Sequence, residues 1–249
     1  MDTISVPVSI ASPARPRPVR RGRSRLYAGL SVFMLAIVTV GFWPSYFGPM
    51  LRGSIARPWV VQLHGAVFVG WMALLLAQVA LVARGRTSAH RRLGQFGVWY
   101  GVLVLISGLA VSFAAPLLHL EAGDWDMHRA AAFLLIPLGD MVLFGGFFGA
   151  AVAYRSRPQV HKRLIVLATV ALLFAAVGRL SFTQSQPLLV LVWISPVLVA
   201  LAHEALTHRR LDRVYSVGLV ILLIGLARLP VSESEPWLRV ARGVLERLR

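Results

Sequence analysis

Long apolar segments follow one another along almost the whole chain, and this feature limits the possible folds more than any other. Seven segments consist mainly of apolar residues, at 26–47, 58–83, 93–118, 128–153, 164–182, 187–206 and 214–229. Most of them exceed the ~20 residues that an α-helix needs to cross the hydrocarbon core of a bilayer. The sequence therefore predicts an all-α polytopic transmembrane helix bundle of about seven spans. The last segment is the shortest, so a bundle of six spans is the alternative.

The composition agrees with a chain that lies almost entirely in a membrane. Hydrophobic residues make up 57% of the 249 residues and charged residues only 14%, which is too little polar material to cover a soluble domain of this size. We expect one transmembrane domain over 26–230. A disordered basic cytoplasmic arm over 1–25 precedes it, and a polar linker with an amphipathic interfacial helix over 231–249 follows it. The absence of cysteine excludes disulfides, thiolate metal sites and covalently attached c-type haem.

The basic residues predict the orientation. A net charge of +16 would suggest nucleic acid in a soluble protein, but here the charges lie between apolar spans, so the lipid bilayer is the expected partner and nucleic acid is not. With a cytoplasmic N-terminus, the other side receives only four basic residues before the final span, Arg52, Arg57, Arg129 and Arg179. Arg in place of Lys, with abundant Ala, Leu and Val, is typical of GC-rich bacterial genomes. We therefore expect a multi-pass protein of a bacterial inner membrane.

One ten-residue pattern occurs twice at the start of predicted spans. The stretches RGRTSAHRRL at 84–93 and RSRPQVHKRL at 155–164 share R-x-R-x-x-x-H-[RK]-R-L, and HRRL recurs at 208–211. Topology explains the basic residues, because all three stretches lie on the predicted cytoplasmic side. Topology does not require a histidine. His90 and His161 are therefore the part of the repeat that needs another explanation.

Four successive spans carry one histidine each at alternating ends. His64 and His128 lie toward the outer side, and His90 and His161 toward the inner side. A haem inside a helix bundle is normally held by two imidazoles from facing helices, and two such sites near opposite faces make a path for electrons. We therefore expect His64 with His128, and His90 with His161, as axial ligands of b-type haem irons. Arg179 would hold a propionate, and a redox partner would exchange the electrons.

This alternation resembles the di-haem cytochrome b561 type, whose four-helix core carries one axial histidine per helix. A closer resemblance covers residues 64–180, where LHGAVFVGW, HRRLG and HKRLIVLATV ending in GRL are similar to a bacterial family of predicted membrane proteins of unknown function. That family has a transmembrane histidine, an HR-x-x-G start and a second H-[KR]-R start. The positions that match are His64, His90, Arg92, Gly94, His161, Arg163 and Arg179. The resemblance implies a membrane bundle but no activity, and His128 is not part of the pattern.

Structural roles are the alternative for the inner histidines. A histidine in the first turn of a helix at a membrane interface is ordinary, whether the helix is capped by Ser88, as for His90, or begins with Pro158, as for His161. In that interpretation the repeated frames only set the topology. The sequence alone leaves both interpretations open.

Polar groups deep inside the spans support a second, non-redox hypothesis. Asp140 lies about twelve residues into the fourth span, where an ionised carboxylate costs ~2.5 to 3.5 kcal/mol, so it must be protonated, paired or in contact with water. His64 lies at hydrocarbon depth, where its alternative role is an interhelical hydrogen bond. With Arg179 these residues would form the polar pocket of a small-molecule permease or a membrane accessory subunit. No phosphate-binding loop, nucleophile elbow or zinc-protease helix occurs, so no catalytic residue is assigned.

Overall fold

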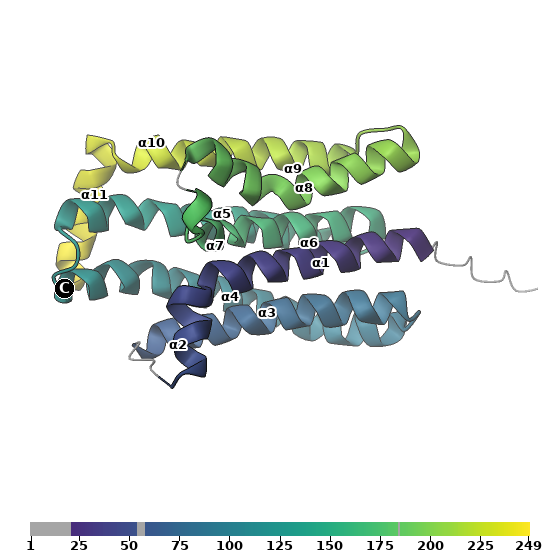
Figure 1. The fold of residues 1–249 in the computed structure, drawn as a ribbon, viewed down its shortest axis with the longest axis horizontal. Helices are drawn as coiled ribbons and strands as arrows, with labels where there is room; N and C mark the ends of the chain where they lie inside the picture. Colours follow the sequence, from purple (N-terminus) through teal and green to yellow (C-terminus); the bar gives the residue numbers. More distant parts are fainter. Residues whose placement is uncertain (1–20, 54–57, 184) are drawn as a thin grey trace, which may run out of the picture.

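The structure is a computed structural model that describes residues 21–53, 58–183 and 185–249. All the regular structure in these residues is helical (Figure 1). Seven segments are long and apolar enough to cross a membrane, at Arg25–Leu51, Trp59–Ala83, Thr87–Glu121, Met127–Ala153, Pro158–Val177, Gln186–His208 and Arg213–Ser232. The prediction of an all-α bundle is confirmed, with seven spans rather than six.

The helices follow the predicted segments closely. They are α1 (Arg21–Phe42), a π-helix (Trp43–Phe47), α2 (Gly48–Leu51), α3 (Trp59–Ala83), α4 (Thr87–Glu121), α5 (Met127–Ala153), α6 (Pro158–Leu172), α7 (Phe174–Val177), α8 (Gln186–His208), α9 (Arg213–Ile224), α10 (Arg228–Ser232) and α11 (Glu235–Leu248). Residues 1–20 of the predicted arm lie outside the described residues, whereas 21–25 form the start of α1. Pro158 is the first residue of α6, as expected. Ser88 is not a cap, because α4 begins at Thr87 and no side chain caps it.

The bundle has two distinct ends. The start of α1 and the loops 84–86, 154–157 and 209–212 lie at the right in Figure 1, and we call this the basic end. The loop 122–126 and α11 lie at the left, and we call this the opposite end. The basic end is the one for which the sequence predicts a cytoplasmic location.

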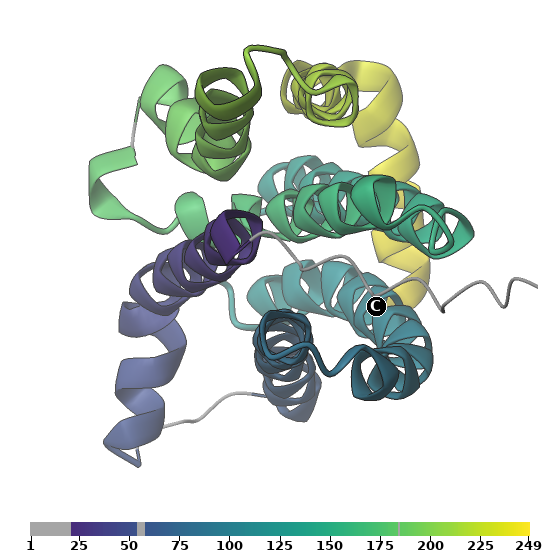
Figure 2. The ribbon, with the colours of Figure 1, turned by 90° about the vertical axis from the view of Figure 1, so that its right-hand side faces the viewer.

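The helices α3 to α6 pack around a cluster of aromatic rings. Trp71 of α3 is buried and its indole N–H donates to the hydroxyl of Thr169 in α6 over 3.3 Å. The rings of Phe144 and Phe148 from α5 meet Trp71 edge to face, with centroids 5.4 and 5.7 Å away. These contacts fix how the helices stand relative to one another. Figure 2 shows α1 against this core on one side, and α8 and α9 as a separate pair on another.

The helix α11 lies across the opposite end of the bundle (Figure 1). The 35 residues of α4 measure about 52 Å at 1.5 Å per residue, well beyond the ~30 Å of a hydrocarbon core. Leu238, Ala241 and Leu245 of α11 are buried against the start of α5. The helix predicted within 231–249 is therefore present, and its apolar face packs on protein. The linker before it is only 233–234, because α10 extends to Ser232.

Candidate functional site: histidines and charges inside the bundle

His90 joins the beginning of α4 to the end of α3. The side-chain amide of Gln78, in the orientation that satisfies its neighbours, donates to Nδ1 of His90 over 2.6 Å and to the carbonyl oxygen of His90 over 3.1 Å. The same amide accepts a hydrogen bond from the backbone N–H of Gly94 over 2.9 Å. Gln78 is therefore the hydrogen-bond partner of His90.

His161 makes the corresponding link between α6 and α5. Its Nδ1–H donates to the carbonyl oxygen of Ala151 over 2.8 Å. Because a carbonyl can only accept, the proton of the neutral ring is on Nδ1 and the lone pair is on Nε2. The histidine of each repeat therefore connects its own helix to the helix that precedes it.

The structure brings the two repeat histidines to the same end of the bundle. His90 lies in the first turn of α4 and His161 in the first turn of α6, and both helices begin at the basic end. Each ring has its Nδ1 engaged by a neighbouring helix. Histidines that bind metals usually donate their second ring N–H to a neighbour, as His161 does, whereas Nδ1 of His90 accepts from Gln78. We call His90 and His161 the basic-end pair.

His64 forms a separate polar contact between α3 and α4. Its Nδ1 lies 3.3 Å from the hydroxyl oxygen of Ser107, and that hydroxyl donates its own proton to the carbonyl oxygen of Val104. With the hydroxyl proton directed to Val104, Ser107 accepts from Nδ1–H of the neutral ring, and the lone pair is on Nε2. Arg179 acts electrostatically on His64. The Arg179 guanidinium also donates to the carbonyl oxygen of Ala175 over 2.6 Å.

His128 has other partners and lies far from His64. Its Nε2 is 3.0 Å from the carboxylate of Glu233, and its Nδ1 accepts from Arg242 over 3.3 Å. Both nitrogens of this exposed ring therefore bind the C-terminal segment. His64 lies beside Ser107, and the next residue of α4, Gly108, faces Met141 of α5.

This register separates the expected outer pair of histidines. His128 lies thirteen residues from Met141 on α5, which is about 20 Å along the helix at 1.5 Å per residue. Two imidazoles that bind one metal bring their nitrogens within about 4 Å, twice a metal–nitrogen bond. The structure therefore does not bring His64 and His128 together as an axial pair.

Asp140 forms a buried ion pair with Arg228 of α10. The guanidinium donates to Oδ1 of Asp140 over 2.6 Å, and each of the two residues is less than a tenth exposed. The guanidinium lies over the rings of Phe174 and Trp193, at 4.5 and 5.6 Å from their centroids. Asp140 was expected to be protonated, paired or in contact with water, and the structure shows it paired. The ion-pair partner of Asp140 is thus Arg228 and not Arg179.

A second buried group of charges connects α6 to α8 and α9. The guanidinium of Arg163 lies 3.2 Å from Glu204 and 2.9 Å from Asp212. Asp212 also accepts from the backbone N–H groups of Val214 and Tyr215 and so caps α9. One signal for this cluster is visible in the sequence, because Asp212 is an acidic residue between the basic residues of a basic-end loop. Neither this cluster nor Arg228 was assigned a role from the sequence.

Metal binding by larger clusters is not indicated in the part of the chain that the structure describes, since no group of three or more His, Asp or Glu side chains is arranged to hold an ion there. No protein-family model matches the chain, and neither the curated proteins nor the solved structures give a match. The function of the chain is therefore inferred from its own geometry.

Proposed function

We propose that this integral membrane protein holds a single b-type haem at the basic end, with Nε2 of His90 and Nε2 of His161 as the axial ligands. The observation that supports this is the basic-end pair, in which one histidine opens α4 and another opens α6 at the same end, each with its Nδ1 held by the preceding helix. A bound haem supplies one-electron redox chemistry. A redox partner would then reach the protein from the same end.

The two rings differ in whether Nε2 has a lone pair available for the iron. His161 already presents the lone pair of Nε2, because its Nδ1–H is donated to the carbonyl of Ala151. Nδ1 of His90 accepts a hydrogen bond from Gln78, so in the neutral ring the proton is on Nε2. A half-turn of the Gln78 amide would present its carbonyl oxygen to Nδ1–H and free Nε2, and it would break the hydrogen bonds of the amide to the His90 carbonyl and the Gly94 N–H. Gln78 is in this proposal a positioning residue for His90.

Basic residues beside the pair suit the carboxylates of a haem. Arg91 interacts electrostatically with His90 and follows it directly in α4. A guanidinium forms short, charge-assisted hydrogen bonds with a propionate. Arg179, which the sequence suggested for this role, lies in the loop that follows α7, away from the basic end, and is not part of the proposed haem site.

Absorption spectra test the proposal. Protein purified from haem-replete cells should show a Soret band that shifts on reduction with dithionite. His90→Ala and His161→Ala should each lose the band, whereas His128→Ala, which removes an exposed histidine of the opposite end, should keep it. Gln78→Leu should keep the band and weaken haem affinity by about 10- to 100-fold, the usual effect of removing a partner of a metal ligand.

Two results would overturn the proposal. The first is the absence of a Soret band in wild-type protein from haem-replete cells. The second is an equal loss of the band in His128→Ala and His161→Ala, since this would place the ligands elsewhere. Thermal unfolding of each variant separates loss of haem from loss of the fold.

A second candidate function has support from the contacts of His64. Nδ1 of this ring contacts Ser107, and Arg179 acts electrostatically on the ring. Tyr46 of the neighbouring π-helix packs against Gly65, and its hydroxyl lies 3.5 Å from the carbonyl oxygen of Gln62. π-helical segments occur frequently at functional sites. A non-redox bundle that binds a small anionic molecule here is the alternative, either as a permease or as an accessory subunit. The same spectra decide between the two, because the alternative requires no haem band.

A further inference from the structure

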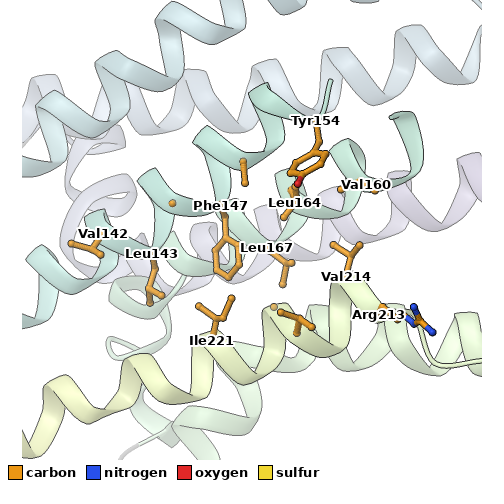
Figure 3. Close-up of a pocket in the computed structure, with 14 residues that line it drawn as sticks. Val142, Leu143, Phe147, Tyr154, Val160, Leu164, Leu167, Arg213, Val214 and Ile221 are labelled. Carbon is orange, nitrogen blue, oxygen red and sulfur yellow. The ribbon is translucent and has the colours of Figure 1, made fainter. Parts of the chain in front are cut away.

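An apolar groove runs along the surface of the bundle between α5, α6 and α9. It has a volume of about 630 Å³, within the range of ~300 to 1,000 Å³ found for ligand sites. Figure 3 shows Val142 and Ile221 toward one end of the groove and Arg213 toward the other. Arg213 is the only charged residue that lines it.

The length of the groove matches one leaflet of a bilayer. Along α5 it extends from Val142 to Tyr154, the residue that follows this helix. These twelve steps measure about 18 Å at 1.5 Å each, and half of a ~30 Å hydrocarbon core is about 15 Å. The groove therefore reaches from the basic end to about the middle of the membrane.

The groove also differs in charge between its two ends. The apolar part is lined by side chains such as Leu143, Phe147 and Leu167, whereas Arg213 and Tyr154 lie at the basic end. Arg157 lies over the ring of Tyr154, 5.6 Å from its centroid. Arg213 is exposed and makes no ion pair among the residues that the structure describes. The mouth is thus positive and the remainder is apolar.

We propose that this groove binds one acyl chain of an anionic phospholipid, whose phosphate lies at Arg213. A ligand that matches this groove needs a negative headgroup at the basic end. It also needs a hydrocarbon chain about as long as one leaflet is deep. Electrostatic attraction of anionic lipids is worth about fivefold in affinity for each basic residue near the surface. This inference is independent of the proposed haem.

Two glycines of α5 provide a matched pair for the test. Gly146 lines the groove, and a Cβ built on it would meet nothing within 4 Å. Gly149 lies one turn further along, is also exposed and has the same open surroundings, but it does not line the groove. Gly146→Leu should fill the groove, and Gly149→Leu should add the same side chain beside it.

Native mass spectrometry of the full chain mixed with equal amounts of phosphatidylglycerol and phosphatidylcholine measures the binding. The wild type and Gly149→Leu should retain one phosphatidylglycerol in preference to phosphatidylcholine. Arg213→Gln should reduce this preference by about fivefold, and Gly146→Leu should retain neither lipid at this site. Thermal unfolding confirms that each variant is folded.

Three outcomes would overturn the inference. These are equal retention of the two lipids by the wild type, identical binding by Gly146→Leu and Gly149→Leu, and retention of an isoprenoid or another non-phospholipid that phosphatidylglycerol does not displace. Equal retention of the two lipids would mean that the groove binds acyl chains without selecting the headgroup. None of them bears on the Soret band, so this inference and the proposed function fail separately.

Discussion

At the residue scale, the two copies of the repeated pattern share the role of the histidine but not that of the last arginine. His90 and His161 each bind the preceding helix of their hairpin, through Gln78 and through the carbonyl of Ala151. Arg163, by contrast, is buried between acidic groups, whereas Arg92 is exposed. The difference arises because α8 and α9 pack beside the second copy.

The buried pair of Asp140 and Arg228 gives a prediction about stability. Asp140→Asn leaves a buried guanidinium without its counter-charge, and we expect a loss of about 3 to 5 kcal/mol in the free energy of unfolding. The double variant Asp140→Leu with Arg228→Met removes both charges and should recover most of this loss. Reversible unfolding in mixed detergent measures both. Equal losses in the single and double variants would contradict an electrostatic origin.

The same pair shows what the sequence can predict about one residue. The need for a partner at Asp140 follows from the cost of a carboxylate in hydrocarbon. The identity of the partner does not follow, because Arg228 is 88 positions away and stands at the end of the last predicted span. Pairing between distant elements depends on tertiary packing, which one sequence does not specify.

At the element scale, hydropathy predicts the spans but not how far they extend beyond the hydrocarbon. The third predicted span, 93–118, becomes the longer helix Thr87–Glu121 because its polar ends remain helical outside the apolar run. The sequence predicts the apolar face of α11, but it does not predict the surface against which this face packs. That face packs on α5 because the long ends of α4 and α5 leave apolar surface there.

The contact between α1 and α7 gives the prediction at this scale. A Cβ on Gly41 would overlap the carbonyl group of Ala176, whereas a Cβ on Gly29 of the same helix would meet nothing within 4 Å. Gly41→Leu should therefore push the two helices apart and lower the free energy of unfolding by about 1 to 3 kcal/mol. Gly29→Leu should change it by less than about 0.5 kcal/mol.

Thermal unfolding of the two leucine variants in the same detergent is the measurement for this contact. A similar change in unfolding temperature for both variants would contradict the prediction, because the effect would then not depend on the contact between α1 and α7. Close approach through small residues is the usual basis of helix association in membranes, where no hydrophobic driving force exists between helices.

At the scale of the whole molecule, the basic loops and both proposed sites lie at the same end of the bundle. The basic loops lie together at one end, where the candidate haem ligands and the mouth of the lipid groove also lie. The opposite end carries α11 and the hydrogen-bond contacts of His119 with Asp124 and of His128 with Glu233. Both proposals therefore assign function to the end that the positive-inside rule places in the cytoplasm.

The cytoplasmic location of the basic end can be measured directly. The chain contains no cysteine, so a maleimide reacts only with a thiol that is introduced. Ser156→Cys reports the basic end and Ala122→Cys the opposite end, and both positions are exposed. In intact cells a membrane-impermeant maleimide should label the chain with Ala122→Cys and reach Ser156→Cys only after permeabilisation. The reverse pattern would place the basic end outside. A haem at His90 and His161 would then exchange electrons with a partner on the outer side, and the lipid of the groove would belong to the outer leaflet.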